Sequence, residues 1–87
     1  MRWTVIYRDA ARRQFLGLPE PLKAQVDQKV VLLQDNPFPP GCRKLNHPEH
    51  LYRLRVGHYR IVYQVDQSER IVRILRVRHR RDVYRDL

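Results

Sequence analysis

The apolar residues at the start of the chain predict a short strand followed by a short helix. Trp3 to Tyr7 is a β-type run, and Asp9 follows it at a position where its side chain can cap a helix. Three apolar residues then lie at near-helical spacing: Ala11, Phe15 and Leu18. Gly17 and Pro19 end this first helix.

A longer helical stripe comes next. Its apolar positions recur at i, i+4, i+8 and i+11, the spacing of a helix that packs on one face. They are Leu22, Val26, Val30 and Leu33. Pro21 fits the first turn, where its missing N–H is not needed, and Asn36-Pro37 stops the helix. The first third of the chain therefore predicts a strand and a helical hairpin that cover a sheet.

From Leu51 onward the hydrophobic period changes to two, which predicts half-buried strands. Gly57-His58 separates two such strands and fits a two-residue hairpin turn with glycine at its first position. The turn predicts the register of the hairpin: Val56 pairs with Tyr59, Arg55 with Arg60, Leu54 with Ile61 and Arg53 with Val62.

This register sorts the hairpin side chains into two faces. The apolar face, available to the helices, carries Tyr52, Leu54, Val56, Tyr59, Ile61 and Tyr63. The other face carries Arg53, Arg55 and Arg60, with no acidic residue beside them. Arginines can simply keep an open sheet soluble. Because directly opposed arginines repel each other, we favour a site that binds an anion.

A third strand, Ile71 to Val77, has faces that depend on the turn before it. A five-residue turn pairs Val65 with Ile71, whereas a four-residue turn shifts the register by one. The first brings Arg76 and Arg78 to the Arg60 face, and the second sends them to the other. We favour the five-residue turn because it keeps three apolar residues in the core: Ile71, Leu75 and Val77. The tail, residues 82–87, can form a turn or two of helix.

The charge of the chain adds a class of partner. Lys and Arg number 18, of which 15 are arginine, against 9 acidic residues, for a formal net charge of +9. Residues 1–42 carry a net charge of +2 and residues 43–87 a net charge of +7. The planar guanidinium suits phosphate binding and base stacking. The basic second half therefore favours nucleic acid over an acidic protein as partner.

Size and cysteine content favour a single cytoplasmic domain spanning residues 1–87. Cys42 is the one cysteine, so no intramolecular disulfide forms, and a reducing compartment is expected. We expect no membrane segment and no signal peptide, since no apolar run is long enough. The proline-rich loop 37–50 holds Cys42, His47 and His50, but their spacing matches no zinc pattern, and no metal is expected there.

Three segments together resemble the RelE/ParE toxin superfamily, and its RelE branch most. They are the helical stripe, the hairpin from Leu51 to Tyr63, and the tail His79-Arg80-Arg81-Asp82-Val83-Tyr84-Arg85. The Gly-x-Tyr-Arg-x-x-Tyr hairpin is shared across the superfamily, whereas the His-Arg-x-Asp-Val-Tyr tail points to RNA cleavage. The resemblance implies an α+β fold, with an N-terminal strand and helical hairpin packed on an antiparallel β-sheet and a short C-terminal helix or turn.

The resemblance implies a toxin of a type II toxin–antitoxin pair that cuts messenger RNA in the ribosomal A site without a metal or cofactor. The implied partners are a cognate antitoxin, the ribosome and messenger RNA. The catalytic positions of the family match Arg53, Arg55, Arg60, Arg80 and Tyr84. We expect RNA binding from Arg76, Arg78 and Arg81. Arginines stand at 53 and 55 where some relatives carry lysine, and Arg78 stands where glycine is often found.

RNA cleavage without a metal uses the 2′-hydroxyl as nucleophile on the adjacent phosphate, and it needs a base, an acid and positive charge. Arginine supplies only the charge, because it does not deprotonate at workable pH. His79 and Tyr84 are the side chains of the motif that can move protons. We expect Tyr84 to act as the base or as a stacking residue, with His79 sharing the proton transfers. Each also has a structural interpretation, Tyr84 as an anchor of the tail and His79 as a solvated strand end.

Two other functions fit the same residues. A ParE-like inhibitor of DNA gyrase uses the same scaffold, but that branch usually lacks the terminal tyrosine. A non-catalytic nucleic-acid-binding module needs only the basic sheet. Sheet-based RNA binders present exposed aromatic residues for stacking, whereas the tyrosines of this sheet are expected to face the core.

Overall fold

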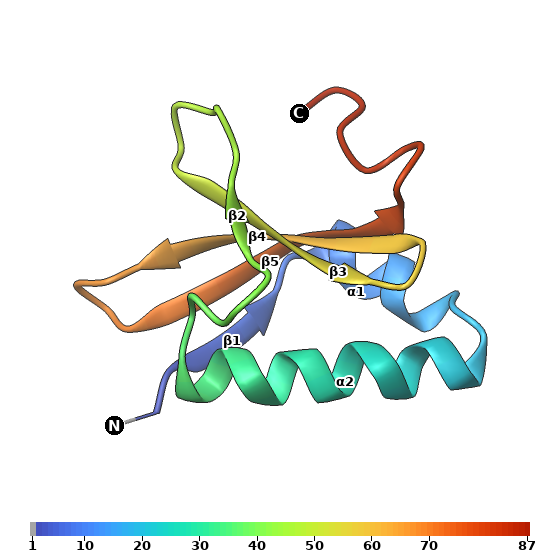
Figure 1. The fold of residues 1–87 in the computed structure, drawn as a ribbon, viewed down its shortest axis with the longest axis horizontal. Coiled ribbons are helices and arrows are strands. Elements are labelled where there is room, and N and C mark those ends of the chain that lie inside the picture. Colours follow the sequence, from blue (N-terminus) through green and yellow to red (C-terminus); the bar gives the residue numbers. More distant parts are fainter. Residues whose placement is uncertain (1) are drawn as a thin grey trace.

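The computed structural model describes residues 2–87, which form two helices and a five-stranded sheet (Figure 1). The elements are β1 (Thr4–Tyr7), α1 (Asp9–Leu16), α2 (Glu20–Asp35), β2 (Arg43–Lys44), β3 (Leu51–Val56), β4 (Tyr59–Asp66) and β5 (Ile71–His79). The strand order is β1-β5-β4-β3-β2. Both helices pack on the same face of the sheet, which confirms the predicted α+β arrangement.

The start of α1 differs from the prediction that Asp9 caps it. The N-cap is Arg8, whose backbone is extended and whose side chain makes no capping bond. The Arg8 N–H donates to the carbonyl oxygen of Ile74 in the sheet (2.9 Å), while its own carbonyl oxygen accepts the N–H of Arg12 (2.9 Å). Arg8 therefore both ends the backbone pairing with β5 and begins α1. Asp9 lies in the first turn, where its carboxylate meets the positive end of the helix dipole.

The stripe on α2 packs as predicted. Val26 and Leu33 are fully buried, and Leu22 and Val30 are half-buried against the same cluster. Asn36 ends the helix as its C-cap. Within residues 2–87, neither helix has the length and apolar character needed to cross a membrane.

Both edges of the sheet differ from the predicted arrangement. The sequence predicts an antiparallel sheet, but β1 pairs in parallel with β5, beginning with Thr4 opposite Ile71. Without β1, the long strand β5 would present a row of unpaired backbone groups to solvent. At the other edge, β2 lies within the predicted loop 37–50 and pairs with β3 through Arg43 opposite Arg53. A strand of two residues is too short to show a period of two.

The β3–β4 hairpin has the predicted register at each of the four expected pairs. Val56 lies opposite Tyr59, so Gly57 and His58 form the turn. Gly57 has a φ of 57°, the positive value that the first residue of this turn type needs and that glycine adopts without strain. Local turn chemistry therefore sets the register of the hairpin.

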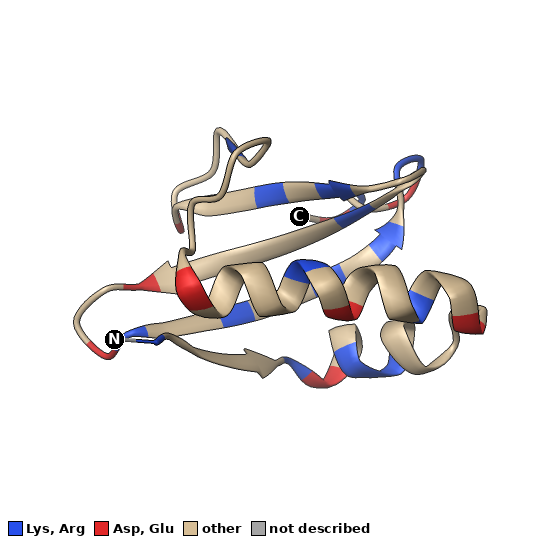
Figure 2. Ribbon diagram, turned by 60° about the horizontal axis from the view of Figure 1, so that its bottom comes forward, with Lys and Arg blue, Asp and Glu red and all other residues tan. Residues whose placement is uncertain are grey.

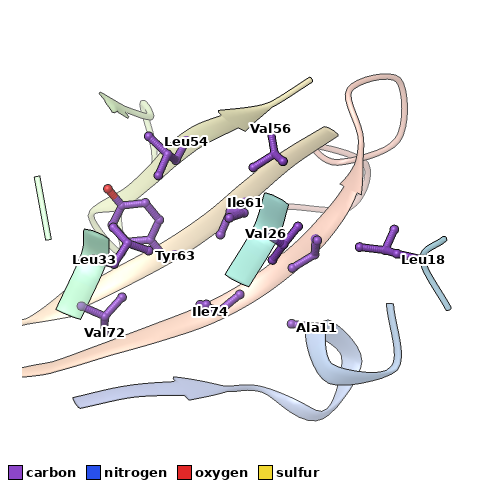
Figure 3. Packing of buried hydrophobic residues seen from close by; sticks show 11 residues of the cluster. Ala11, Leu18, Val26, Leu33, Leu54, Val56, Ile61, Tyr63, Val72 and Ile74 are labelled. Carbon is purple, nitrogen blue, oxygen red and sulfur yellow. The ribbon is translucent and has the colours of Figure 1, made fainter. Parts of the chain in front are cut away.

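The main core lies between the two helices and the inner face of β3, β4 and β5 (Figure 3). Tyr63 is its largest fully buried side chain, and its hydroxyl donates a hydrogen bond to the carbonyl oxygen of Pro37 (2.8 Å). Desolvation by burial raises the pKa of Tyr63. Tyr52 and Tyr59 are half-buried against the same cluster. The prediction that these three tyrosines face the core is confirmed.

We expect Tyr63→Phe to lower the free energy of unfolding by about 1 kcal/mol, because it leaves a buried carbonyl oxygen without its donor. Urea denaturation followed by circular dichroism measures the change. Tyr52→Phe is the control, since it removes a hydroxyl from a half-buried ring of the same face. A larger loss for Tyr52→Phe than for Tyr63→Phe would contradict the importance given to the bond with Pro37.

The turn between β4 and β5 is shorter than predicted. Asp66 lies opposite Ile71, so four residues connect the strands instead of five. The Asp66 carboxylate accepts hydrogen bonds from the N–H of Glu69 (3.1 Å) and the hydroxyl of Ser68 (2.8 Å), which stabilise this tight loop. These two bonds, the first being the stronger influence, lower the pKa of Asp66. The preference for a five-residue turn is therefore wrong.

A β-bulge follows in β5. Tyr63 lies opposite Ile74, but the preceding residue Val62 lies opposite Arg76, so Leu75 is an extra residue. The bulge shifts the register by one. Arg76 consequently lies on the predicted face, which the four-residue turn alone would have reversed.

The bulge also changes which apolar residues of β5 enter the main core. Val77 is buried there, as predicted. Leu75 instead packs on the opposite face of the sheet, in a smaller cluster around Val62. Near the turn, Val72 and Ile74 occupy the core in place of Ile71, because the shorter turn reverses this part of the strand.

Candidate functional site

Two rows of residues cross the face of the sheet opposite the main core. The first row consists of Arg55, Arg60 and Arg78, directly opposite one another on β3, β4 and β5. The second consists of Arg43, Arg53, Val62 and Arg76. We call the six arginines of these rows the arginine face. Figure 2 shows the basic segments of β3, β4 and β5 converging toward the end where β3 joins β4. Because opposed like charges destabilise a sheet, this arrangement indicates an anionic ligand.

Arg60 is the electrostatic centre of the arginine face. Its Nη1 donates hydrogen bonds to the carbonyl oxygens of Gly57 (3.1 Å) and Tyr59 (2.9 Å), which hold the side chain at the turn. Desolvation lowers the pKa of Arg60, the positive charges around it lower that pKa further, and Tyr84 opposes them. The residues near enough to exert these effects are Arg55, Arg53, Tyr84 and Arg80. The structure thus brings together five of the six predicted catalytic residues.

The tail after β5 turns back over this face. The carbonyl oxygen of His79 accepts the N–H groups of Asp82 (2.9 Å) and Val83 (3.0 Å), which reverses the chain. The Val83 side chain is fully buried against Leu51 and Val62, on the same side as the arginines. The tail consists of turns, within the range predicted for it.

Tyr84 follows this buried anchor and is 43% exposed. It lines a pocket of about 380 Å³ together with Leu45, Asn46, His47 and Leu87. The sequence prediction omits Asn46 and gives His47 no role, because no local pattern connects loop 37–50 with the tail. The connection is tertiary, since Leu45 packs in the same small cluster as Val83.

The guanidinium of Arg76 donates hydrogen bonds to the backbone of the tail. Nη1 donates to the carbonyl oxygens of Val83 (2.9 Å) and Arg85, and Nη2 donates to that of Asp86 (3.1 Å). The sequence predicts an RNA-binding cation at this position. In the structure the two terminal nitrogens are directed at the protein's own backbone.

The His79 side chain lies on the other face of the sheet from Arg53, Arg55 and Arg60. It is paired with Tyr59, whose side chain packs on the main core, so the two share the face opposite the arginines. The His79 ring contacts the rings of Tyr59 (5.4 Å between centroids) and His58 (6.3 Å). Its Nδ1 accepts the backbone N–H of Arg81 (3.2 Å). His79 and Tyr84 are therefore not brought together.

The remaining predicted residues lie around the end of β5. Arg78 is half-buried opposite Arg60. Arg80 and Arg81 are exposed just beyond the strand, and the N–H of Arg80 donates to the carbonyl oxygen of His58 (2.8 Å). In the part of the chain that the structure describes, no three His, Cys, Asp or Glu side chains gather as possible metal ligands.

Known proteins match this chain over most of its length. The family model described as "ParE toxin of type II toxin-antitoxin system, parDE" matches residues 4–84. A putative RelE-like toxin protein of Escherichia coli is 33% identical over an alignment of 88 positions, which spans 97% of this chain and 92% of that protein. Toxin RelG of Mycobacterium tuberculosis is 35% identical over 86 residues, which cover 98% of this chain and 99% of RelG.

Solved structures share the fold. The toxin–antitoxin complex RelBE2 of Mycobacterium tuberculosis contains a chain that matches with a TM-score of 0.79 at 30% identity, over 91% of this chain and 99% of that one. A chain of the archaeal RelE–RelB complex from Pyrococcus horikoshii OT3 matches with a TM-score of 0.82 at 24% identity, over 95% and 100%. Together with the matching family model, these likenesses show that the chain belongs to the RelE/ParE superfamily of type II toxin–antitoxin toxins.

Proposed function

We propose that this toxin is a metal-independent endoribonuclease that cuts messenger RNA in the ribosomal A site and thereby arrests translation. The observation that carries the proposal is the tail anchored by buried Val83 on the arginine side of the sheet, which brings Tyr84, a side chain able to exchange a proton, near Arg60. The likeness to toxins of RelE type favours this branch of the superfamily over the gyrase inhibitors.

The reaction is an internal transfer of the phosphate. The 2′-oxygen loses its proton to a base and attacks the adjacent phosphorus, and the bond from phosphorus to the 5′-oxygen breaks. The upstream fragment keeps a 2′,3′-cyclic phosphate, and the leaving 5′-oxygen takes a proton from solvent water. Negative charge increases on the phosphate oxygens in the transition state, so positive groups already in place accelerate the step.

The arginines supply that positive charge. Arg60 is central because its guanidinium is partly desolvated and flanked by Arg53 and Arg55 on the neighbouring strand. An anion bound there relieves the repulsion among them, which favours binding as the phosphate gains charge. Arg80 adds a further charge from the tail. Arg78 and Arg81 then contact the RNA backbone beside the cleaved bond, as positively charged groups commonly do.

Tyr84 is the base in this proposal. In its phenolate form it takes the proton of the 2′-hydroxyl. The expected share of His79 in the proton transfers is less favoured, since its ring lies on the Tyr59 side of the sheet. We assign His79 to the packing of the strand end.

A cognate antitoxin is the proposed protein partner. Related toxins have been crystallised with RelB, in the complexes from Pyrococcus horikoshii, Mycobacterium tuberculosis and Escherichia coli. An antitoxin segment binds a toxin by adding an amphipathic helix or a strand to its surface. Covering the arginine face or displacing the tail that carries Tyr84 would each stop the chemistry.

The mapping of messenger 5′ ends in growth-arrested cells tests the proposal. We expect new 5′-hydroxyl ends within codons of translated messages, matched by 2′,3′-cyclic phosphates on the upstream fragments. The matched control is expression of the chain together with its antitoxin. Intact messages accompanied by DNA breaks would identify a ParE-like gyrase inhibitor instead. Intact messages and intact DNA, with RNA still bound by the purified chain, would leave only a non-catalytic binding module.

A further inference from the structure

Arg76 is bonded to the tail by its whole guanidinium end. Its guanidinium donates to three main-chain carbonyl oxygens, those of Val83, Arg85 and Asp86. These oxygens lie in a segment of turns, where carbonyl groups have no regular partner in a helix or sheet. A planar guanidinium can satisfy several such acceptors at once, because its donors form a fixed fork.

The bulge in β5 directs the Arg76 side chain to the face of the sheet that the tail covers. The extra residue Leu75 turns Arg76 to the arginine face, opposite Val62. Val62 in turn packs against Val83, so the strand position and the tail already touch through their apolar neighbours. Bulges commonly redirect one side chain near a functional site. Here the redirected side chain is the one that holds the tail.

The acceptors lie on both sides of Tyr84 in the chain. Val83 precedes it and is fixed twice, by its buried side chain and by the bond from Arg76 to its carbonyl oxygen. Arg85 and Asp86 follow it and are fixed by the same guanidinium. The backbone of Tyr84 is therefore held at each end, while its side chain stays 43% exposed and able to meet a ligand.

We propose that Arg76 is a positioning residue that holds Tyr84 beside Arg60, and that it does not bind RNA. The inference rests on the proposed nuclease function for its catalytic consequence. Its structural part, the hold on the tail, stands independently of any reaction. A displacement of about 1 Å in a catalytic group can lower a rate by about 100-fold, so the loss of this hold should appear in catalysis.

The test compares Arg76→Gln, Arg76→Lys and wild type on ribosomes programmed with a short messenger. We expect Arg76→Gln to lower kcat by about 100-fold while KM changes less than about threefold, because the residue acts on geometry and not on binding. Arg76→Lys should recover part of kcat, since one ammonium reaches fewer of the carbonyl oxygens. Hydrogen exchange measured on the same proteins should be faster at the amides of residues 83–86 in Arg76→Gln.

A double-mutant cycle separates positioning from a general loss of stability. In a Tyr84→Phe background, Arg76→Gln should lower kcat by less than about twofold further, because the residue through which it acts is already inactive. Arg73→Gln is the matched control. It removes an arginine of the same strand whose partner is Asp66, far from the tail, and should leave both kcat and tail exchange unchanged.

Several outcomes would overturn the inference. A rise in KM with unchanged kcat and unchanged tail exchange in Arg76→Gln would make Arg76 an RNA-binding cation. An undiminished loss of kcat in the Tyr84→Phe background would show that Arg76 acts elsewhere. Absence of cleavage by the wild-type chain would overturn the proposed function, whereas tail exchange in Arg76→Gln would still decide whether this residue holds the tail.

Discussion

Arg80→Ala combined with Tyr84→Phe should abolish growth arrest and reduce messenger cleavage on the order of 10⁴-fold. Tyr84→Phe removes the proposed base, and Arg80→Ala removes one of the positive charges that act on Arg60. General-base catalysis and one well-placed positive group each contribute about 10²-fold or more. Growth after induction and the yield of cleaved message from programmed ribosomes measure the effect.

The same double variant should fold and bind the antitoxin as the wild type does. Arg80 is exposed, and its backbone bond to His58 does not depend on its side chain. Phe at position 84 keeps the ring, and the buried anchor Val83 is unchanged. The matched control is Arg73→Ala with Tyr52→Phe, which removes an arginine and a hydroxyl away from the tail and should still arrest growth. Full toxicity of the Arg80–Tyr84 double variant would show the nuclease proposal to be wrong.

Arg60→Gln should lower kcat by about 10²- to 10³-fold, the usual effect of removing one group that stabilises developing negative charge. Glutamine keeps a polar side chain of similar reach but carries no charge. The same change should leave the thermal unfolding midpoint unchanged or higher. Arg60 lies directly between Arg55 and Arg78 on the neighbouring strands, and its loss relieves their mutual repulsion.

The prediction is specific because kcat falls while the unfolding midpoint does not. Single-turnover cleavage and differential scanning calorimetry on one preparation measure both. Arg60→Lys should fall between wild type and Arg60→Gln, because it keeps the charge without the planar fork. If the unfolding midpoint falls and the activity is lost only in proportion to the fraction of unfolded protein, Arg60 has a structural role. Retained activity in Arg60→Gln would indicate that Arg53 and Arg55 stabilise the negative charge of the transition state instead.

The hairpin shows how far local chemistry can be followed from the sequence. Gly57 admits a two-residue turn, and a two-residue turn allows one register. With the register set, the period of two assigns every side chain to a face, so Arg55 opposite Arg60 could be predicted. The stripe on α2 was equally readable, because its spacing depends on helix geometry alone.

The third strand shows where local chemistry is insufficient. Two errors in the sequence prediction, the missing bulge at Leu75 and the longer turn, cancelled for Arg76 and Arg78. The turn is set by residues within three positions of Asp66, whereas the bulge depends on a partner distant in the sequence. Asp66 tightens the turn through Ser68 and Glu69, and the bulge forms where Leu75 can pack beside Val62 on the far face.

The candidate site divides in the same way. The sequence by itself determined the opposed arginines of β3 and β4 and the tail motif that contains Tyr84, because turn type and residue identity are local properties. Only the tertiary structure decided that His79 faces Tyr59, that Tyr84 lies near Arg60, and that Arg76 binds the tail. The last two outcomes depend on the burial of Val83, which brings the end of the chain over the sheet. Contacts between segments that are distant in the sequence produce no periodic pattern, so the sequence alone does not predict them.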